Sequence, residues 1–299
     1  MKLARLAAFV LALQAGAALG QDDAAPVVLS GTLAKARTTG AVTIAFRESS
    51  VPFSFLSPRK EPIGYSIELC KKLVEAIGEA VGKELAIRWV AVTSETRIDA
   101  IVSGRADLEC GSTTDNLERR KLVSFSPTIF VAGTKLLVRR GSPIRSFRDL
   151  GGRTVIVTAG TTNEKAMQEI ARRFKLDFKL AAARDHADSY AQLEAGKADA
   201  FATDDVLLYG LIAQHKAQKK FQVVGEFLSY DPYGVMFRRD DAQLAALVKQ
   251  AFRDLAEDGE VERQYKRWFL RRLPSGESLD LPMSPQLETL IRAMAAKPE

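Results

Sequence analysis

Short apolar runs typical of β-strands alternate along this chain with segments whose apolar residues follow a helical spacing. Residues 42–46 and 85–92 are two such runs. Between them, Ile67, Cys70 and Val74 fall on one face of a helix, the spacing that lets a helix pack its apolar side against a sheet. An alternation of this kind predicts an α/β fold and excludes an all-α or all-β one.

A short pattern occurs twice and indicates two similar lobes. Residues 101–108 (IVSGRADL) and 193–200 (LEAGKADA) each combine a helix end, a glycine and the start of a strand. Glycine is suited to the left-handed backbone conformation in which many helices end. The first copy leads to a polar loop with Ser112 and Thr114, and the second leads to Asp204. Because such turns are common in α/β proteins, the repeat supports two lobes only together with other features.

The loop after the first copy, residues 110–119 (CGSTTDNLER), collects groups that favour an anion. We expect it to leave a strand and enter a helix, so that free N–H groups of the helix start and the Arg119 guanidinium together bind a carboxylate. In the alternative, Thr114 or Asn116 only caps the helix and Arg119 lies in solvent.

The N-terminus has the pattern of a secretory signal peptide. Lys2 and Arg5 precede the apolar residues 6–13, and small residues lead up to Gly20. We expect cleavage near Gly20, so that residues 1–20 are removed and the rest is a periplasmic protein. No cysteine stands at the expected new N-terminus to carry a lipid anchor, and no later segment is apolar enough to span a bilayer. The 299 residues suffice for two lobes of ordinary size.

The charge pattern argues against a nucleic-acid partner. The formal net charge is +6 at pH 7, and it falls to +4 when Lys2 and Arg5 leave with the signal peptide. Basic residues are mixed with acidic ones, as in residues 71–75 and 262–267, which is typical of solvated helix faces. Because nucleic-acid binding requires a basic stripe with interleaved aromatic residues, we expect no such partner.

Two states are open to the cysteines, Cys70 and Cys110. In an oxidising compartment they form a disulfide if the helix that contains Cys70 lies against the strand end at Cys110. Otherwise they are a pair of buried thiols, and the sequence leaves both states open. Two cysteines and two histidines, His186 and His215, do not favour a metal site, and we expect neither a metal nor another cofactor.

Seven separated segments together resemble the periplasmic glutamate/aspartate-binding proteins of ABC importers, of the type II periplasmic binding protein family. The segments are 47–54 (RESSVPFS), 64–66 (GYS), 93–97 (TSETR), 109–114 (ECGSTT), 160–162 (GTT), 185–189 (DHADS) and 204–205 (DD). They follow in order over nearly the whole mature chain, and their joint occurrence makes the resemblance specific. It implies a two-lobe periplasmic binding protein fold with two hinge strands. It also implies a monomer that binds an acidic amino acid and delivers it to the membrane permease of an ABC importer.

The resemblance places the lobe connections at two β-rich runs. Residues 130–139 form the first run and residues 233–238 the second. If the chain crosses out at the first and back at the second, residues 135–232 form an inserted lobe II. Residues 30–134 and 233–299 then together form lobe I. Two connecting strands act as a hinge, and a cleft between lobes is a usual location for a ligand.

The resemblance also implies a clamp for an α-amino acid. Arg119, with Thr114 and Ser112, is expected to bind the α-carboxylate, and Asp204 the α-ammonium. Each charge-assisted hydrogen bond contributes about 1.5–3 kcal/mol where water is excluded. In the alternative, Asp204 caps the helix that follows. We expect Asp204 to bind the ligand and Asp205 to cap the helix.

Further candidates follow other predicted strands. Thr161 and Thr162 precede a helix whose first N–H groups suit a carboxylate, although a plain threonine cap explains them equally well. Arg47, Arg97 and His186 are the cations that a second carboxylate on the ligand would need. Arg47 ends the first strand, where a side chain reaches the cleft.

The environment of these cations favours a dicarboxylate. Arg97 lies three residues after Ser94, the expected cap, in a first helical turn where a cation is unfavourable unless an anion binds there. Acidic neighbours are expected to hold His186 partly protonated. Such a site disfavours glutamine, which leaves an arginine unpaired. Glu95 and Ala187 depart from the family pattern, so the choice between glutamate and aspartate stays open.

Three functions share this fold. The leading one is a binding protein that closes two lobes around an acidic amino acid. The second is a dehydratase-like periplasmic enzyme with Glu48, Glu109 or His186 as the acid or base. Because nothing pairs these residues as a nucleophile and a base, we expect no enzyme. The third is a sensor component that presents the ligand to a receptor.

Overall fold

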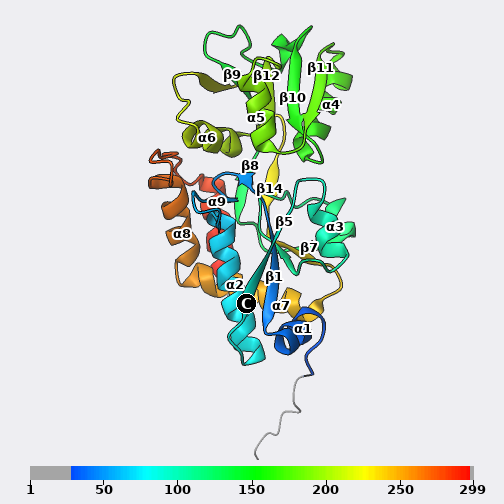
Figure 1. Cartoon of the computed structure of the whole chain (residues 1–299), viewed down its shortest axis with the longest axis vertical. Helices are drawn as coiled ribbons and strands as arrows, with labels where there is room; N and C mark the ends of the chain where they lie inside the picture. The colour runs from blue at the N-terminus through cyan, green and yellow to red at the C-terminus, as the bar shows by residue number, and fades with distance from the viewer. Residues whose placement is uncertain (1–27, 297–299) are drawn as a thin grey trace, which may run out of the picture.

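Two lobes joined by a pair of strands make up this protein, of which the computed structural model describes residues 28–296 (Figure 1). The fold is α/β, as the alternation of apolar runs predicted. The signal peptide expected at residues 1–20 lies outside the described residues. Within residues 28–296, no helix has both the length and the apolar character that a membrane crossing requires.

Lobe I, the lower half of Figure 1, contains a five-stranded sheet to which two distant parts of the chain contribute. Its strands, in spatial order, are β5 (Ala86–Ala91), β1 (Ala41–Phe46), β6 (Leu108–Glu109), β15 (Met236–Arg238) and β7 (Val123–Phe125). β1 runs parallel to β5 and β6, whereas β15 runs antiparallel to β6 and β7. The chain therefore leaves this sheet after β7 and re-enters it at β15.

Helices and a small sheet complete lobe I. They are α1 (Gly31–Thr39), α2 (Tyr65–Val81), α3 (Arg97–Val102), α7 (Ala242–Glu257), α8 (Glu260–Tyr265), α9 (Pro285–Ala295), and the sheet of β2 (Ser49–Ser50), β3 (Ser54–Leu56) and β4 (Pro62–Ile63). In α2, Ile67, Cys70 and Val74 are buried, which confirms the helical face predicted from their spacing.

Lobe II, the upper half of Figure 1, repeats this design. Its strands, in spatial order, are β11 (Lys179–Ala183), β10 (Thr154–Thr158), β12 (Ala200–Asp204), β9 (Thr134–Arg139) and β13 (Phe221–Val224). Its helices are α4 (Thr162–Phe174), α5 (His186–Glu194) and α6 (Asp205–Gln214). β10 runs parallel to β11 and β12, and β9 antiparallel to β12 and β13. β6 and β12, which end the two copies of the repeat, thus hold the same middle position in their sheets.

A two-stranded antiparallel sheet of β8 (Phe130–Ala132) and β14 (Asp231–Tyr233) joins the lobes (Figure 1). The predicted run 130–139 is therefore not one strand, because Gly133 separates β8 from β9. A Cβ at Gly133 would lie 2.4 Å from the carbonyl oxygen of Ser229, so any other residue would push the two segments apart. This pairing supports lobe limits at 134–135 and 232–233, which stay a prediction.

The return connection lies earlier than the predicted run 233–238, because β14 carries it and β15 already belongs to the lobe I sheet. Aromatic rings fill the core beside this connection. The ring centroid of Phe53 lies 5.0 Å from that of Phe130 on β8 and 5.1 Å from that of Tyr233 on β14. Edge-to-face pairs of this kind stabilise a core beyond the burial of their area. They pack both hinge strands against lobe I.

Candidate functional site

The predicted ligand-binding side chains gather where the two lobes face each other. Nine of the ten are buried and one, Thr162, is half-buried. The buried nine are Arg47, Ser94, Arg97, Ser112, Thr114, Arg119, Thr161, His186 and Asp204. Buried polar groups in native proteins almost always have hydrogen-bond partners. A concentration of such groups at one place therefore indicates a functional site.

The ends of parallel strands explain this grouping. In lobe I, Arg47 follows β1, Ser94 lies after β5 and Ser112 after β6, and these three strands are neighbours. Their carboxyl ends share one edge of the sheet, which is where open α/β sheets bind ligands. In lobe II, Thr161 lies after β10 and Asp204 ends β12, again on adjacent parallel strands.

Three buried guanidiniums dominate the electrostatics of lobe I's side of the site. Burial and the neighbouring Arg97 lower the pKa of both Arg47 and Arg119 to about 9. Burial also lowers the pKa of Arg97 itself. Taking a cation out of water disfavours its charged form, and a second cation nearby disfavours it further. An anion bound between these side chains would relieve both effects.

Several buried donors of this cluster have no hydrogen-bond partner anywhere in residues 28–296. They are both terminal nitrogens of Arg47, Nε of Arg97, and the hydroxyls of Ser94 and Ser112. Leaving one buried donor unpaired costs about 1–3 kcal/mol, and more for a charged one. A protein that keeps such a set together gains from it only when an acceptor binds, and carboxylate oxygens are the best acceptors for guanidinium groups.

Arg119 and Thr114 connect the cluster to lobe II. Arg119 Nη1 donates to the Thr114 carbonyl at 2.8 Å, and the Thr114 hydroxyl lies 3.3 Å from that of Thr162 in lobe II. On the surface beside them, Lys165 Nζ of lobe II pairs with Glu118 of lobe I at 2.6 Å. The two lobes are therefore in contact across the site.

Asp204 faces the site from lobe II in a fixed orientation. Its carboxylate accepts hydrogen bonds from Asn163 Nδ2 at 2.7 Å and from the hydroxyl of Tyr233 on the hinge strand. Burial and the nearby carboxylate of Asp231 raise the pKa of Asp204 to about 8. Asp204, not Asp205, occupies the N-cap position of α6, and its side chain makes no capping hydrogen bond. The prediction that Asp205 caps this helix is therefore wrong, because the helix begins at Asp205 itself.

His186 is buried and neutral, so the prediction that acidic neighbours hold it partly protonated is wrong. Burial, together with the positive charges of Arg47 and Arg97, lowers its pKa well below the usual value. Its Nδ1 lies 2.8 Å from the hydroxyl of Thr158. The neighbour Asp185 is occupied with capping α5, where it accepts from the backbone N–H at position 188. A neutral imidazole still has one N–H to donate, so His186 remains a candidate neutral donor.

The loop at residues 110–119 differs from its prediction. It does not enter an α-helix but runs to a single 3-10 turn, Arg119–Lys121, so it offers no helix start to an anion. Thr114 instead forms a β-bridge with Tyr233 of the hinge strand. Of the capping alternative, one part is present, because Asn116 Oδ1 accepts from the Arg119 N–H at 2.9 Å at the start of this turn. The other part is wrong, because Arg119 is buried and does not lie in solvent.

The two expected caps beside the site have different outcomes. Ser94 does not cap α3, because Thr96 holds the N-cap position and neither side chain makes the capping bond. Thr161 does cap α4, accepting from the Glu164 N–H at 3.2 Å.

Cys70 and Cys110 form a disulfide, with their Cα atoms 6.3 Å apart. The bond joins α2 to the end of β6, directly before the loop that contains Ser112 and Thr114. Of the two states that the sequence left open, the structure has the disulfide and not the pair of buried thiols. The disulfide anchors that loop to the core of lobe I.

Sequence reasoning missed several residues that shape the site. Asn163 and Tyr233 hold Asp204, and Asp231 accepts a hydrogen bond from the Thr114 hydroxyl at 3.0 Å. Glu109, considered only as an acid or base, is completely buried, and its Oε2 accepts from the Thr113 hydroxyl at 2.6 Å. Their signals were weak, since Asn163 reads as part of a helix and Tyr233 and Asp231 as part of a strand.

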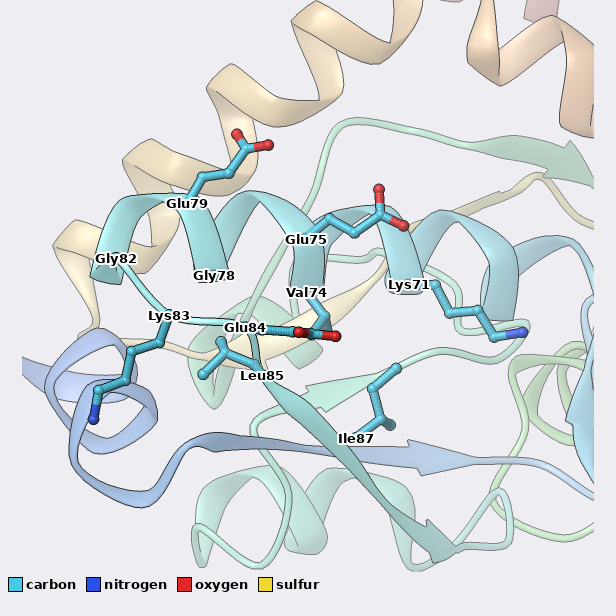
Figure 2. Close-up of a pocket in the computed structure, with 10 residues that line it drawn as sticks. All are labelled: Lys71, Val74, Glu75, Gly78, Glu79, Gly82, Lys83, Glu84, Leu85 and Ile87. Atoms are coloured by element: carbon cyan, nitrogen blue, oxygen red, sulfur yellow. The ribbon is translucent and has the colours of Figure 1, made fainter.

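Cavities of the structure differ in where they lie relative to this site. A cavity of about 180 Å³ opens beside it and is lined by residues of both lobes, among them Arg47, Thr96 and Asp185. A larger groove of about 620 Å³ lies on lobe I between α2 and β5, and Figure 2 shows that its lining contains none of the predicted site residues. In the described part of the chain, no group of three or more His, Cys, Asp or Glu residues is arranged to hold a metal ion.

Two proteins with similar sequences extend over nearly the whole chain. An L-glutamate/L-aspartate-binding protein of Pseudomonas aeruginosa is 42% identical over 279 residues, which cover 91% of this chain and 92% of the relative. A glutamate/aspartate import solute-binding protein of Escherichia coli is 37% identical, with 98% of this chain and 97% of the relative covered.

Solved structures of amino-acid-binding proteins share the fold. An ancestral arginine-binding protein bound to arginine superposes with a TM-score of 0.70 at 26% identity, covering 77% of this chain and 98% of that one. A mutant of ArgBP from T. maritima gives a TM-score of 0.73 at 22% identity, covering 81% and 100%. Residues 42–271 match the family described as bacterial extracellular solute-binding proteins, family 3. With this match, the two-lobe fold and the two relatives that span its length, the chain belongs to the bacterial extracellular solute-binding proteins of family 3.

Proposed function

We propose that this protein binds an acidic amino acid, glutamate or aspartate, between its lobes and delivers it to the permease of an ABC importer. The observation that carries the proposal is the buried cluster of Arg47, Arg97 and Arg119 with unpartnered donors, opposite the carboxylate of Asp204. An acidic amino acid presents two carboxylates and one ammonium, which is the charge pattern that complements this arrangement. The names of the two relatives that are 42% and 37% identical agree with it.

In this proposal each end of the ligand has its own set of residues. Asp204 accepts from the α-ammonium, while Arg119, with Ser112 and Thr114, binds the α-carboxylate. The side-chain carboxylate is then left to the remaining donors of the site. They are Arg47, Ser94, Arg97, Thr161, Thr162 and His186.

We infer binding without catalysis, by a periplasmic monomer that forms after removal of residues 1–20. Of the three acid or base candidates, Glu48 is exposed, the carboxylate of Glu109 accepts from Thr113, and His186 is neutral and contacts Thr158. A proton-transfer group needs access to the substrate proton and a partner that helps to transfer it. Nothing in the described residues pairs any of these three with such a partner.

Isothermal titration of the purified mature protein with glutamate, aspartate and glutamine tests the proposal. We expect one-to-one binding of an acidic amino acid and at least about tenfold weaker binding of glutamine, which leaves a buried guanidinium unpaired. Arg119→Ala and Asp204→Asn should each weaken binding at least about a hundredfold, since each removes a charged partner from a buried pair.

Matched controls come from the adjacent positions. Arg120→Ala removes an exposed arginine that pairs with Asp115, and Asp205→Asn removes the carboxylate next to Asp204. Arg120→Ala should bind the ligand within about threefold of the wild type, as surface charges do. Asp205→Asn, whose half-buried side chain keeps an acceptor for the Gly133 N–H, should also bind within about threefold because, among the described residues, its carboxylate makes no hydrogen bond to a site side chain. Equal losses in the site variants and the controls, or no binding of any acidic amino acid, would refute the proposal.

A further inference from the structure

Glu109 is a buried carboxylate beside the arginine cluster, and the binding of a ligand does not by itself explain its presence. It ends β6, pairs in register with Ala45 of β1, and is completely buried. Of its two carboxylate oxygens, Oε2 accepts from Thr113, whereas Oε1 is buried without a partner among the described residues. Burying an anion is unfavourable unless cations lie close by.

The cations close to Glu109 are those of the site. Its negative charge is the largest influence that raises the pKa of each of the three guanidiniums, Arg47, Arg97 and Arg119. A Cβ added to Gly111 would lie 2.4 Å from Oε1 of Glu109 and 2.9 Å from Cγ of Arg47, so both side chains pack on the same glycine. The glycine permits this approach of the anion to the cluster.

The other carboxylates whose charge reaches the cluster are held by hydrogen bonds to other groups, Asp185 as the cap of α5. Asp231 accepts from Thr114 and from Ser229, and Asp204 accepts from Asn163 and Tyr233. Among the side chains of lobe I alone, three guanidiniums and Glu109 leave two positive charges, because Asp185 and Asp204 belong to lobe II and Asp231 to the hinge strand. A dicarboxylic amino acid brings two carboxylates to that side and its ammonium to Asp204. The charges then balance.

From this we propose that Glu109 is a specificity-determining residue: a built-in counter-ion that sets how much negative charge the site accepts. The inference rests on the proposed function and deepens it. In the ligand-free protein Glu109 keeps the three guanidiniums together. In the complex it limits their surplus charge to the two carboxylates of the ligand.

Glu109→Gln tests the proposal, because glutamine keeps the shape and the acceptor for Thr113 but removes the charge. The first measurement is the ratio of the dissociation constants for glutamine and glutamate, by isothermal titration. Without the counter-ion the cluster attracts a second carboxylate more strongly, so this ratio should rise at least about tenfold over the wild type, as expected for unit charges in a protein interior. An unchanged or lower ratio overturns the proposal.

Two control variants separate charge from structure. Glu48→Gln makes the same chemical change at an exposed carboxylate next to Arg47, and should leave the ratio within about twofold because solvent screens that position. Thr113→Val removes the hydrogen bond to Glu109 but keeps its charge. It should also preserve the ratio. A rise in Thr113→Val equal to that in Glu109→Gln would mean that loop anchoring is responsible and would overturn the proposal.

The second measurement does not depend on amino-acid binding. Sodium sulfate is added to the ligand-free proteins at constant ionic strength, with sodium chloride as the balancing salt, and the melting temperature is recorded. Sulfate should raise the melting temperature of Glu109→Gln more than that of the wild type or of Glu48→Gln, because it replaces the missing anion. An equal response in all three overturns the proposal.

The two measurements also separate this inference from the proposed function. A wild-type protein that binds no acidic amino acid refutes the proposed function, and the sulfate comparison then decides the role of Glu109 alone. Should Glu109→Gln not fold, the double variant Glu109→Gln/Arg47→Gln removes one charge of each sign and should regain a cooperative melting transition. Failure of this variant to fold as well overturns the counter-ion role.

Discussion

Asp204 provides a prediction that ties the geometry of the site to a measurable proton. Burial and Asp231 raise its pKa to about 8, so its carboxyl is about nine-tenths protonated at pH 7. The α-ammonium of an amino acid attracts the ionised form. Binding at pH 7 should therefore release close to one proton per ligand into the buffer.

The same linkage fixes the pH dependence of affinity. Since the ligand selects ionised Asp204, the association constant should rise about tenfold from pH 6 to 7 and roughly fivefold from pH 7 to 8, then level off. The pKa of Arg47 and of Arg119 lies at about 9, so the cations do not offset this rise. His186, whose pKa is well below its usual value, does not titrate in this range.

Isothermal titration at pH 7 in buffers of different ionisation enthalpy measures the released proton directly. The observed enthalpy should vary with buffer enthalpy with a slope near one proton for the wild type and for Asp205→Asn, and near zero for Asp204→Asn. Glutarate, which has both carboxylates but no ammonium, is a second control and should release none. An enthalpy for glutamate that is independent of buffer would show that Asp204 is already ionised or does not meet the ammonium, and the reasoning would fail.

The other predictions concern stability and the support of Asp204. Replacing Cys70 and Cys110 together by alanine should lower the free energy of unfolding in urea by about 4 kcal/mol, from the chain entropy of a loop of 40 residues; an unchanged midpoint would contradict the anchoring role. Phe53→Ala should cost about 3–5 kcal/mol in the same assay, because the ring is fully buried against both hinge strands, and a loss below about 1 kcal/mol would refute that packing. Tyr233→Phe removes the hydroxyl that donates to Asp204 and should weaken glutamate binding about tenfold at pH 7 while its melting temperature changes little; unaltered affinity in titration would exclude this support.

The fold was predictable from the sequence because its signals are local. The spacing of Ile67, Cys70 and Val74 needs only one helix and one apolar surface to be interpreted, and all three side chains are buried. The repeat at residues 101–108 and 193–200 is a local pattern too, and its two strands hold the same place in their sheets. Breaks such as Gly133 depend on a distant neighbour, the Ser229 carbonyl, and so could not be located in advance.

The site was predictable to the extent that strand ends position it. Arg47 could be chosen because it ends a strand from which a side chain reaches the cleft, whereas Asp204 was chosen from the resemblance; the structure has each at the end of a parallel strand of its own lobe. The state of His186 could not, because the charges that act on it come from Arg47 and from Arg97, far away in sequence, whereas its sequence neighbours are acidic. Proximity along the chain gave the wrong sign of the pKa shift.

The hinge strand β14 relates the two halves of the clamp to the closing motion. Tyr233 donates to Asp204 of lobe II, and Asp231 accepts from Thr114 of lobe I, so both partners proposed for the α-amino acid end are bonded to the same strand. Groups attached to a hinge move least when lobes rotate about it. We expect the residues proposed for the α-amino acid end to stay close together in the open protein. The residues proposed for the side-chain carboxylate, Arg47 of lobe I and His186 of lobe II among them, should come together only on closure. An acidic amino acid would then dock by its α-groups first, and its side-chain carboxylate would supply the free energy that closes the lobes. A neutral amino acid would dock the same way without closing them.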